Sequence, residues 1–188
     1  PLSVALDDWM EAVETSTAAT TAKKYRTEAK QFAKFLSATT AGPMVEEVDA
    51  KTIRRFLSDR RKNTSTSTAN VAKKILSGFF ESQLKEEIIQ ANPVRLVDSF
   101  KETSVEKRRA KRRAFTLAEV KLAFSKAPDD FWRYMLLMGF FTGLRLGDGA
   151  CLRWGSIDFD TGFIRETAAK TEKTLNIPMH STLSTFLR

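Results

Sequence analysis

The sequence predicts a mainly α-helical protein with a small antiparallel β-hairpin or sheet. Three observations support this fold class: helically spaced apolar residues through the first hundred positions, a basic stretch near the middle, and two β-type runs near the end. The basic stretch, 101–113, holds seven basic and two acidic residues and cannot pack into a core. We therefore expect a four-helix bundle at 1–98, a basic linker at 99–114 and a mixed α/β part at 115–188.

The first two predicted helices follow from apolar periodicity. Apolar residues recur at helical spacing over Leu2–Val13. A second helix can open at Thr20 or Thr21, and its apolar stripe runs over Tyr25–Leu36. Gly42-Pro43 then breaks the chain.

Two further helices complete the predicted bundle. Asp49 is a good N-cap for the third helix. The polar residues 63–68 predict a loop before the fourth helix, and Asn92-Pro93 closes the bundle. The apolar side of the fourth helix is expected to consist of Val71, Ile75, Leu76, Phe79, Phe80 and Leu84.

The last part of the chain begins with helices and changes to strands. Thr116 and Glu119 have the spacing of a capping box that opens a helix. We expect next a buried helix over 129–141, a short helix over 145–152, and two strands over 163–167 and 174–178.

Charge and composition narrow the classes of partner. The net charge of +8 favours a polyanion, although charge alone fits a merely basic protein equally well. Cys151 and His180 are the only cysteine and the only histidine, so neither a disulfide nor a zinc site is expected, and a reducing cytoplasm fits. The N-terminus has no secretory pattern, and the longest apolar run, 135–141, is too short to span a membrane.

The run Thr142–Asp148, Thr-Gly-Leu-Arg-Leu-Gly-Asp, is the strongest candidate for chemistry. It places Arg145 at the start of a helix, after a glycine break and three residues before a carboxylate. A fixed guanidinium presents a planar set of donors that matches two phosphate oxygens. The alternative is an arginine that only pairs with Asp148 on the protein's own surface.

Together with Cys151–Asp158 and Ala169–Lys173, this run resembles the tyrosine recombinase (phage integrase) family. Thr21 and Tyr25 match the Thr-x-x-x-Tyr start of the family's first domain. The resemblance implies a four-helix SAM-like core-binding domain, a basic linker and a truncated mixed α/β catalytic domain. It also implies DNA strand cleavage and rejoining through a phosphotyrosine, with no cofactor, by a tetramer on double-stranded DNA.

The resemblance assigns roles to individual residues. Arg145 matches the arginine that clamps the scissile phosphate, and Asp148 is expected to orient it. Lys170 resembles the general acid that protonates the leaving 5′ oxygen, with Lys173 as its competitor. Trp154 is expected in the core. His180 is not taken as the family's catalytic histidine, because the arginine three residues later is missing.

Further cations are predicted to contact DNA, although each alone fits a solvated surface residue equally well. They lie on the second helix, at the start of the fourth helix, in the linker and near Lys170. They are Lys23, Lys24, Arg26, Lys30, Lys73, Lys74, Arg108, Arg109, Lys111, Arg112, Arg113 and Lys173.

The family's His-x-x-Arg motif and tyrosine nucleophile have no match in these 188 residues. Tyr25 and Tyr134, the only tyrosines, precede Arg145 and do not fit the nucleophile position. We therefore expect a monomeric fragment that binds DNA without cleaving it, and a tetrameric recombinase as its parent. The alternatives are a non-catalytic DNA-binding regulator with the same fold and a basic protein that binds an acidic protein.

Overall fold

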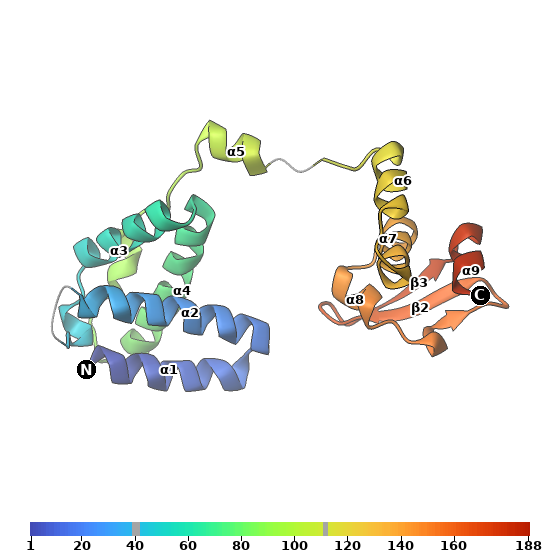
Figure 1. Ribbon diagram of the computed structural model, residues 1–188. Helices are drawn as coiled ribbons and strands as arrows, with labels where there is room; N and C mark the ends of the chain where they lie inside the picture. The colour runs from blue at the N-terminus through green and yellow to red at the C-terminus, as the bar shows by residue number, and fades with distance from the viewer. Residues whose placement is uncertain (39–41, 111–112) are drawn as a thin grey trace. The chain divides into compact units, whose positions relative to one another are not determined.

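The computed structural model describes residues 1–38, 42–110 and 113–188, with the side chains of 109 and 110 left aside. The chain divides into two compact units, Pro1–Lys111 and Arg112–Arg188 (Figure 1). Within the described residues the structure is mostly helical with a small antiparallel sheet, which confirms the predicted fold class.

The first unit is a bundle of four main helices in which α1 packs on α2 and α3 packs on α4 (Figure 1). The predicted four helices are confirmed. Their bounds are α1 Leu2–Ser16, α2 Ala19–Ser37, α3 Ala50–Asn63 and α4 Thr66–Lys85. Short 3-10 turns lie at η1 Val45–Glu47 and η2 Pro93–Leu96, and α5 spans Ser104–Ala110.

Four phenylalanines form the centre of this bundle. Phe32, Phe56, Phe79 and Phe80 are almost fully buried and meet edge to face, with ring centroids 5.0 Å apart for Phe32 and Phe56. Burying each such side chain contributes about 2–3 kcal/mol relative to exposure. The sequence therefore supplies the first unit with a dense aromatic core.

The start of α4 differs from the prediction. Residues 66–68 are helical and not part of the predicted loop, because Ser65 caps the helix and accepts a hydrogen bond from the Thr68 N–H at 3.1 Å. Val71 was expected in the core but is 46% exposed. The smaller Ala69 and Ala72 occupy the buried side of this turn.

The start of the predicted linker, residues 99–106, packs against the first unit, and we call this segment the strap. The Asn70 side chain accepts from the Phe100 N–H and donates to its carbonyl, both at 2.9 Å. The Thr66 hydroxyl donates to Glu106 at 2.6 Å, and the Arg61 guanidinium lies 5.0 Å from the Phe100 ring. The structure thus has a docked irregular segment and helix α5 where a linker was expected, and the predicted domain limits stay a prediction.

The second unit combines short helices with a three-stranded sheet. Its helices are α6 Leu117–Ser125, α7 Asp130–Thr142, α8 Leu146–Ala150 and α9 Ser181–Leu187, with η3 at Trp154–Ser156. The strands β1 Ile157–Asp158, β2 Phe163–Ala168 and β3 Lys173–Pro178 are antiparallel in the order β1-β2-β3. The two predicted strands and the capping box of Thr116 and Glu119 are confirmed, whereas β1 and α9 were not predicted.

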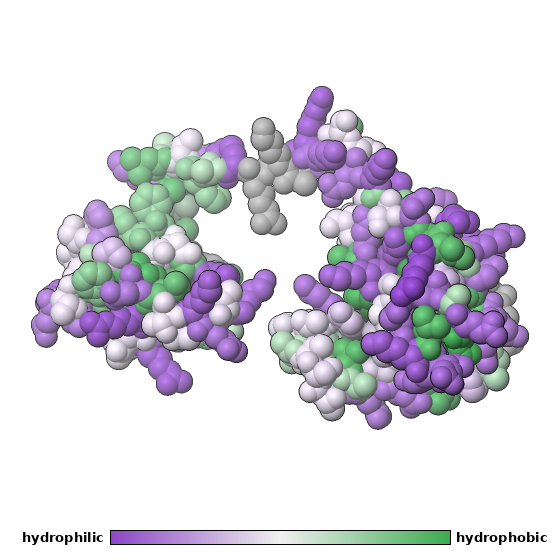
Figure 2. Space-filling view, turned by 180° about the vertical axis from the view of Figure 1, so that it is seen from behind, coloured by the Kyte–Doolittle hydropathy of each residue, from purple (hydrophilic) through white to green (hydrophobic). Residues whose placement is uncertain are grey.

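The core of the second unit is small. Within the described residues its fully packed cluster consists of Met138, Leu144, Ile164 and Leu183. The predicted helix over 129–141 is confirmed as α7, but it is only partly buried: Met135 and Met138 lie inside, whereas Trp132 and Phe140 are about half exposed. Trp154, expected in the core, is 68% exposed. Figure 2 shows green, hydrophobic areas on the surface of the second unit.

Candidate nucleic-acid interface

Arg145 lies at the junction between α7 and α8. Gly143 ends α7 in the left-handed region with φ 66°, and the Leu144 N–H donates to the Thr142 hydroxyl at 3.1 Å. Arg145 follows as the N-cap of α8, as the sequence predicted. Its backbone is fixed from both sides while its side chain stays 53% exposed, so several guanidinium donors face solvent.

Asp148 is buried beneath this arginine. Its Oδ2 lies 3.6 Å from Nη1 of Arg145, and its Oδ1 accepts a hydrogen bond from the Ala169 N–H at 3.3 Å. Oδ2 is buried without a hydrogen-bond partner among the described residues. A carboxylate taken out of water needs compensating charge, so Asp148 and Arg145 hold each other in place. The ion pair considered as an alternative is present, but it leaves most of the guanidinium free.

Lys170 lies on the hairpin tied to this pair. It is exposed in the turn 169–172 between β2 and β3, next to the Ala169 amide that bonds Asp148. The turn is closed by the Glu172 N–H, which donates to the Ala168 carbonyl at 2.8 Å. Lys173 is also exposed and faces Ala168 across the ladder. The choice between the two lysines stays a prediction.

Tyr134 supports the helix that Arg145 caps. Its hydroxyl donates to the Gly149 carbonyl at 2.8 Å, from α7 to α8. Burial, and after it the nearby Glu166, raises the pKa of the Tyr134 hydroxyl above its ordinary value of 10. This tyrosine is a structural part of the site that spacing along the sequence could not identify.

His180 has a structural environment in the second unit. It caps α9 by accepting the Thr182 N–H on Nδ1 at 3.1 Å, and its ring stacks on Phe141 at 4.3 Å between centroids. Among the described residues, no cluster of three or more His, Cys, Asp or Glu could hold a metal ion. Nor does any described helix have the length and apolarity needed to cross a membrane.

The predicted cations of α2 divide into free and paired side chains. Lys23, Lys24 and Lys30 are exposed and form no ion pair among the described residues. Arg26 instead pairs with Glu14 of α1, donating from Nε at 2.7 Å. This pair holds α1 against α2 and occupies part of the guanidinium.

The cations predicted on α4 divide in the same way. Lys74 is exposed, whereas Lys73 is half-buried and donates from Nζ to the Ser99 hydroxyl at 3.1 Å. Lys73 therefore holds the strap on the bundle.

The cations predicted in the linker are described only in part. Arg108 is exposed on α5. The Arg109 side chain, Lys111 and Arg112 lie outside the described residues. Arg113 binds Glu119 at 2.8 Å, and it lowers the pKa of that carboxyl, together with donors from Thr116, to about 2.

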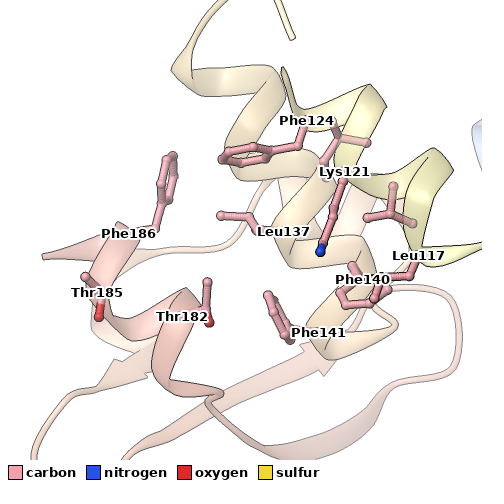
Figure 3. A pocket seen from close by; sticks show the side chains of 11 residues that line it. Leu117, Lys121, Phe124, Leu137, Phe140, Phe141, Thr182, Thr185 and Phe186 are labelled. Carbon is pink, nitrogen blue, oxygen red and sulfur yellow. The ribbon is translucent and has the colours of Figure 1, made fainter. Parts of the chain in front are cut away.

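An apolar groove lies between α6, α7 and α9 of the second unit. Figure 3 shows Phe124, Leu137, Phe140 and Phe186 around it, with Lys121 as the charged side chain at its edge. A phosphate backbone needs donors and positive charge, so this groove does not suit nucleic acid. The polar candidates gather instead around Arg145.

Comparison with known proteins finds similarity to phage integrases and to a tyrosine recombinase. The family described as phage integrase, N-terminal SAM-like domain, matches residues 6–90. A curated relative, the tyrosine recombinase XerD of Ralstonia nicotianae (strain ATCC BAA-1114 / GMI1000), is 24% identical over 185 residues. The match covers 94% of this chain and 56% of XerD, so the chain spans about half the length of this relative.

Solved structures share the fold. A lambda integrase tetramer bound to a Holliday junction aligns with a TM-score of 0.80 and 19% identity, over 97% of this chain and 52% of that chain. A lambda integrase dimer bound to a COC' core site aligns at 0.77 with 20% identity, over 96% and 64%. The Tn1549 transposon integrase in complex with a circular intermediate DNA aligns at 0.70 with 15% identity, over 98% and 63%.

Proposed function

We propose that this chain belongs to the tyrosine recombinase (phage integrase) family, whose N-terminal domain model and XerD relative it resembles. In this proposal the chain binds duplex DNA and brings Arg145 and Lys170 to one phosphate. The observation that carries the proposal is the Asp148 bridge. One buried carboxylate contacts the Arg145 guanidinium at 3.6 Å and the backbone beside Lys170 at 3.3 Å. An arginine and a lysine on separate elements are thereby held to a common support.

The chemistry proposed for the two cations differs. The exposed Arg145 guanidinium stabilises negative charge on the non-bridging oxygens of the phosphate under attack. Lys170 protonates the leaving 5′ oxygen, with Lys173 as the alternative donor. Attack by a tyrosine keeps the phosphodiester energy in a protein–DNA ester, so the reaction needs no nucleotide cofactor.

We propose that the 188-residue chain itself binds DNA without cutting it. After Arg145 it contains neither a tyrosine nor a His-x-x-Arg run. Lys23, Lys24, Lys30, Lys74 and Arg108 are exposed and unpaired among the described residues. They supply phosphate contacts for this binding. Tetrameric strand exchange is proposed only for a recombinase that adds the nucleophile.

Salt-dependent binding to a labelled duplex tests the proposal. Each phosphate contact contributes about −0.9 to the slope of log affinity against log salt. Arg145→Ala should therefore flatten the slope by about 0.9. Arg153→Ala, which removes a neighbouring exposed arginine, is the matched control and should leave the slope unchanged. A denaturing gel should show no covalent DNA adduct; an adduct, or affinity that is insensitive to salt, would refute the proposal.

A further inference from the structure

Helix α3 carries more positive charge than its neighbours, and the predicted DNA contacts leave it out. Over Ala50–Asn63 it has six basic residues and one acidic residue. Two of its arginines are used inside the bundle. Arg60 donates two hydrogen bonds to the buried Glu28, at 2.7 and 3.0 Å, and Arg61 donates to Thr66 at 2.9 Å.

The four other cations form what we call the α3 basic face. It consists of Lys51, Arg54, Arg55 and Lys62. All four side chains are exposed, and their spacing of three, four and eleven residues places them on one side of a helix. That side is opposite the buried side made by Ile53, Phe56 and Leu57.

Charge on this face is not balanced by the protein. None of the four cations forms an ion pair or a side-chain hydrogen bond within the described part of the chain, although Arg60 and Arg61 both do. Lys51 lies three and four residues before Arg54 and Arg55, a spacing at which like charges repel and destabilise a helix. Asp59, four residues after Arg55 and three before Lys62, lines the same groove and offsets one of the four positive charges, although it forms no ion pair. In the free protein the cations of this face therefore repel one another, and a bound anion would reduce this repulsion.

The shape of the face favours an extended polyanion. From Lys51 to Lys62 the helix rises about 16 Å at ~1.5 Å per residue, close to the length of about five base pairs of duplex at ~3.4 Å each. The small Ser58 lies between the cations and leaves a shallow groove bounded by the half-buried Phe35 of α2. Protein interfaces usually have an apolar centre with charges at the rim, and the centre of this face is polar.

We propose that the α3 basic face is an additional contact surface for the phosphate backbone of duplex DNA, an inference that rests on the proposed function. It adds a third helix to the predicted contacts on α2 and α4. Its arginines bind phosphate oxygens without reading base sequence, so it raises affinity uniformly across DNA sequences.

The test compares two double variants of the full 188-residue chain. Arg54→Gln with Arg55→Gln removes two charges from the face. Lys85→Gln with Lys126→Gln removes two exposed charges elsewhere and serves as the matched control. Fluorescence anisotropy with a labelled duplex, measured across a series of salt concentrations, gives the slope for each protein. Each lost phosphate contact lowers the slope of log affinity against log salt by about 0.9 in magnitude. The first variant should therefore flatten the slope by about 1.8 and the control by much less.

The outcomes separate this inference from the proposed function. If the wild-type chain does not bind DNA, the proposed function fails, and this inference fails with it. If the wild type binds with a steep slope and the Arg54/Arg55 variant keeps that slope, only the α3 basic face is refuted. If that variant binds DNA normally but loses binding to poly-glutamate, the face serves an acidic protein and the inference is likewise overturned. Thermal midpoints of both variants that are no lower than that of the wild type establish that the substitutions leave the fold intact.

Discussion

A single carboxylate, Asp148, joins the helix capped by Arg145 to the hairpin that carries Lys170. The sequence predicted its partnership with Arg145, because residues three apart on a helix are neighbours. The bond from the Ala169 N–H could not be predicted, since it joins α8 to the turn after β2, 21 residues away along the chain. The contact between Arg145 and Asp148 is therefore local in the sequence, whereas the bond between Asp148 and Ala169 depends on tertiary structure.

Replacing Asp148 by alanine should destabilise the second unit more than an exposed aspartate replacement does. The change leaves the Ala169 N–H without its acceptor and removes the anion beside Arg145. Loss of a partner from a buried polar group costs about 1–3 kcal/mol. Asp130→Ala is the control, because this aspartate pairs with Arg133 while its side chain is 83% exposed. Urea denaturation followed by circular dichroism measures the free energy of unfolding of both variants. Equal losses of stability would refute the role given to Asp148.

At the scale of the element, local signals predicted where helices begin. Asp49 and Thr116 cap α3 and α6 as expected, because a cap depends only on the following three residues. Burial was predicted less well. Val71, expected in the core from an apolar pattern, and Trp154, expected there from the family resemblance, are both exposed, since burial depends on which neighbouring element covers a side chain. The strap over residues 99–106 was missed for the same reason, because its contacts are with α3 and α4.

Helix α5 should respond to acid through Glu106. Hydrogen bonds from the Thr66 hydroxyl and then from Thr103 lower the pKa of this carboxyl from 4.5 to about 2. A lowered pKa stabilises the folded state above the unfolded value, and this contribution disappears as the pH falls from about 4.5 towards 2. Glu106→Gln should therefore destabilise the first unit at pH 6 and match the wild type near pH 2. Urea titrations between these pH values measure the difference.

Glu102→Gln is the matched control for this titration, because Glu102 is exposed and forms no hydrogen bond or ion pair within the described residues. Its stability should follow the wild type at every pH. If the Glu106→Gln variant remained less stable than the wild type down to pH 2, its loss of stability would come from shape and packing, not from the charge.

At the scale of the whole molecule, the two units differ in how much apolar surface they bury. The first unit packs a continuous core around Phe32, Phe56, Phe79 and Phe80. In the second unit α6 contains no buried residue, and exposed apolar side chains include Leu117 and Leu122 of α6 and Phe140 of α7. Because burial of apolar surface is the main driving force of folding, the first unit should be the more stable one.

The three tryptophans allow this difference to be measured. Trp9 packs on Tyr25 and Phe79 in the first unit, whereas Trp132 and Trp154 are exposed in the second. In a Trp132→Phe, Trp154→Phe variant, fluorescence reports only the first unit, while circular dichroism reports the helices of both. The circular dichroism signal should begin to fall at a lower urea concentration than the Trp9 signal, because the second unit unfolds first. Coincident curves would instead indicate that the chain unfolds as one cooperative body and would refute the lower stability of the second unit.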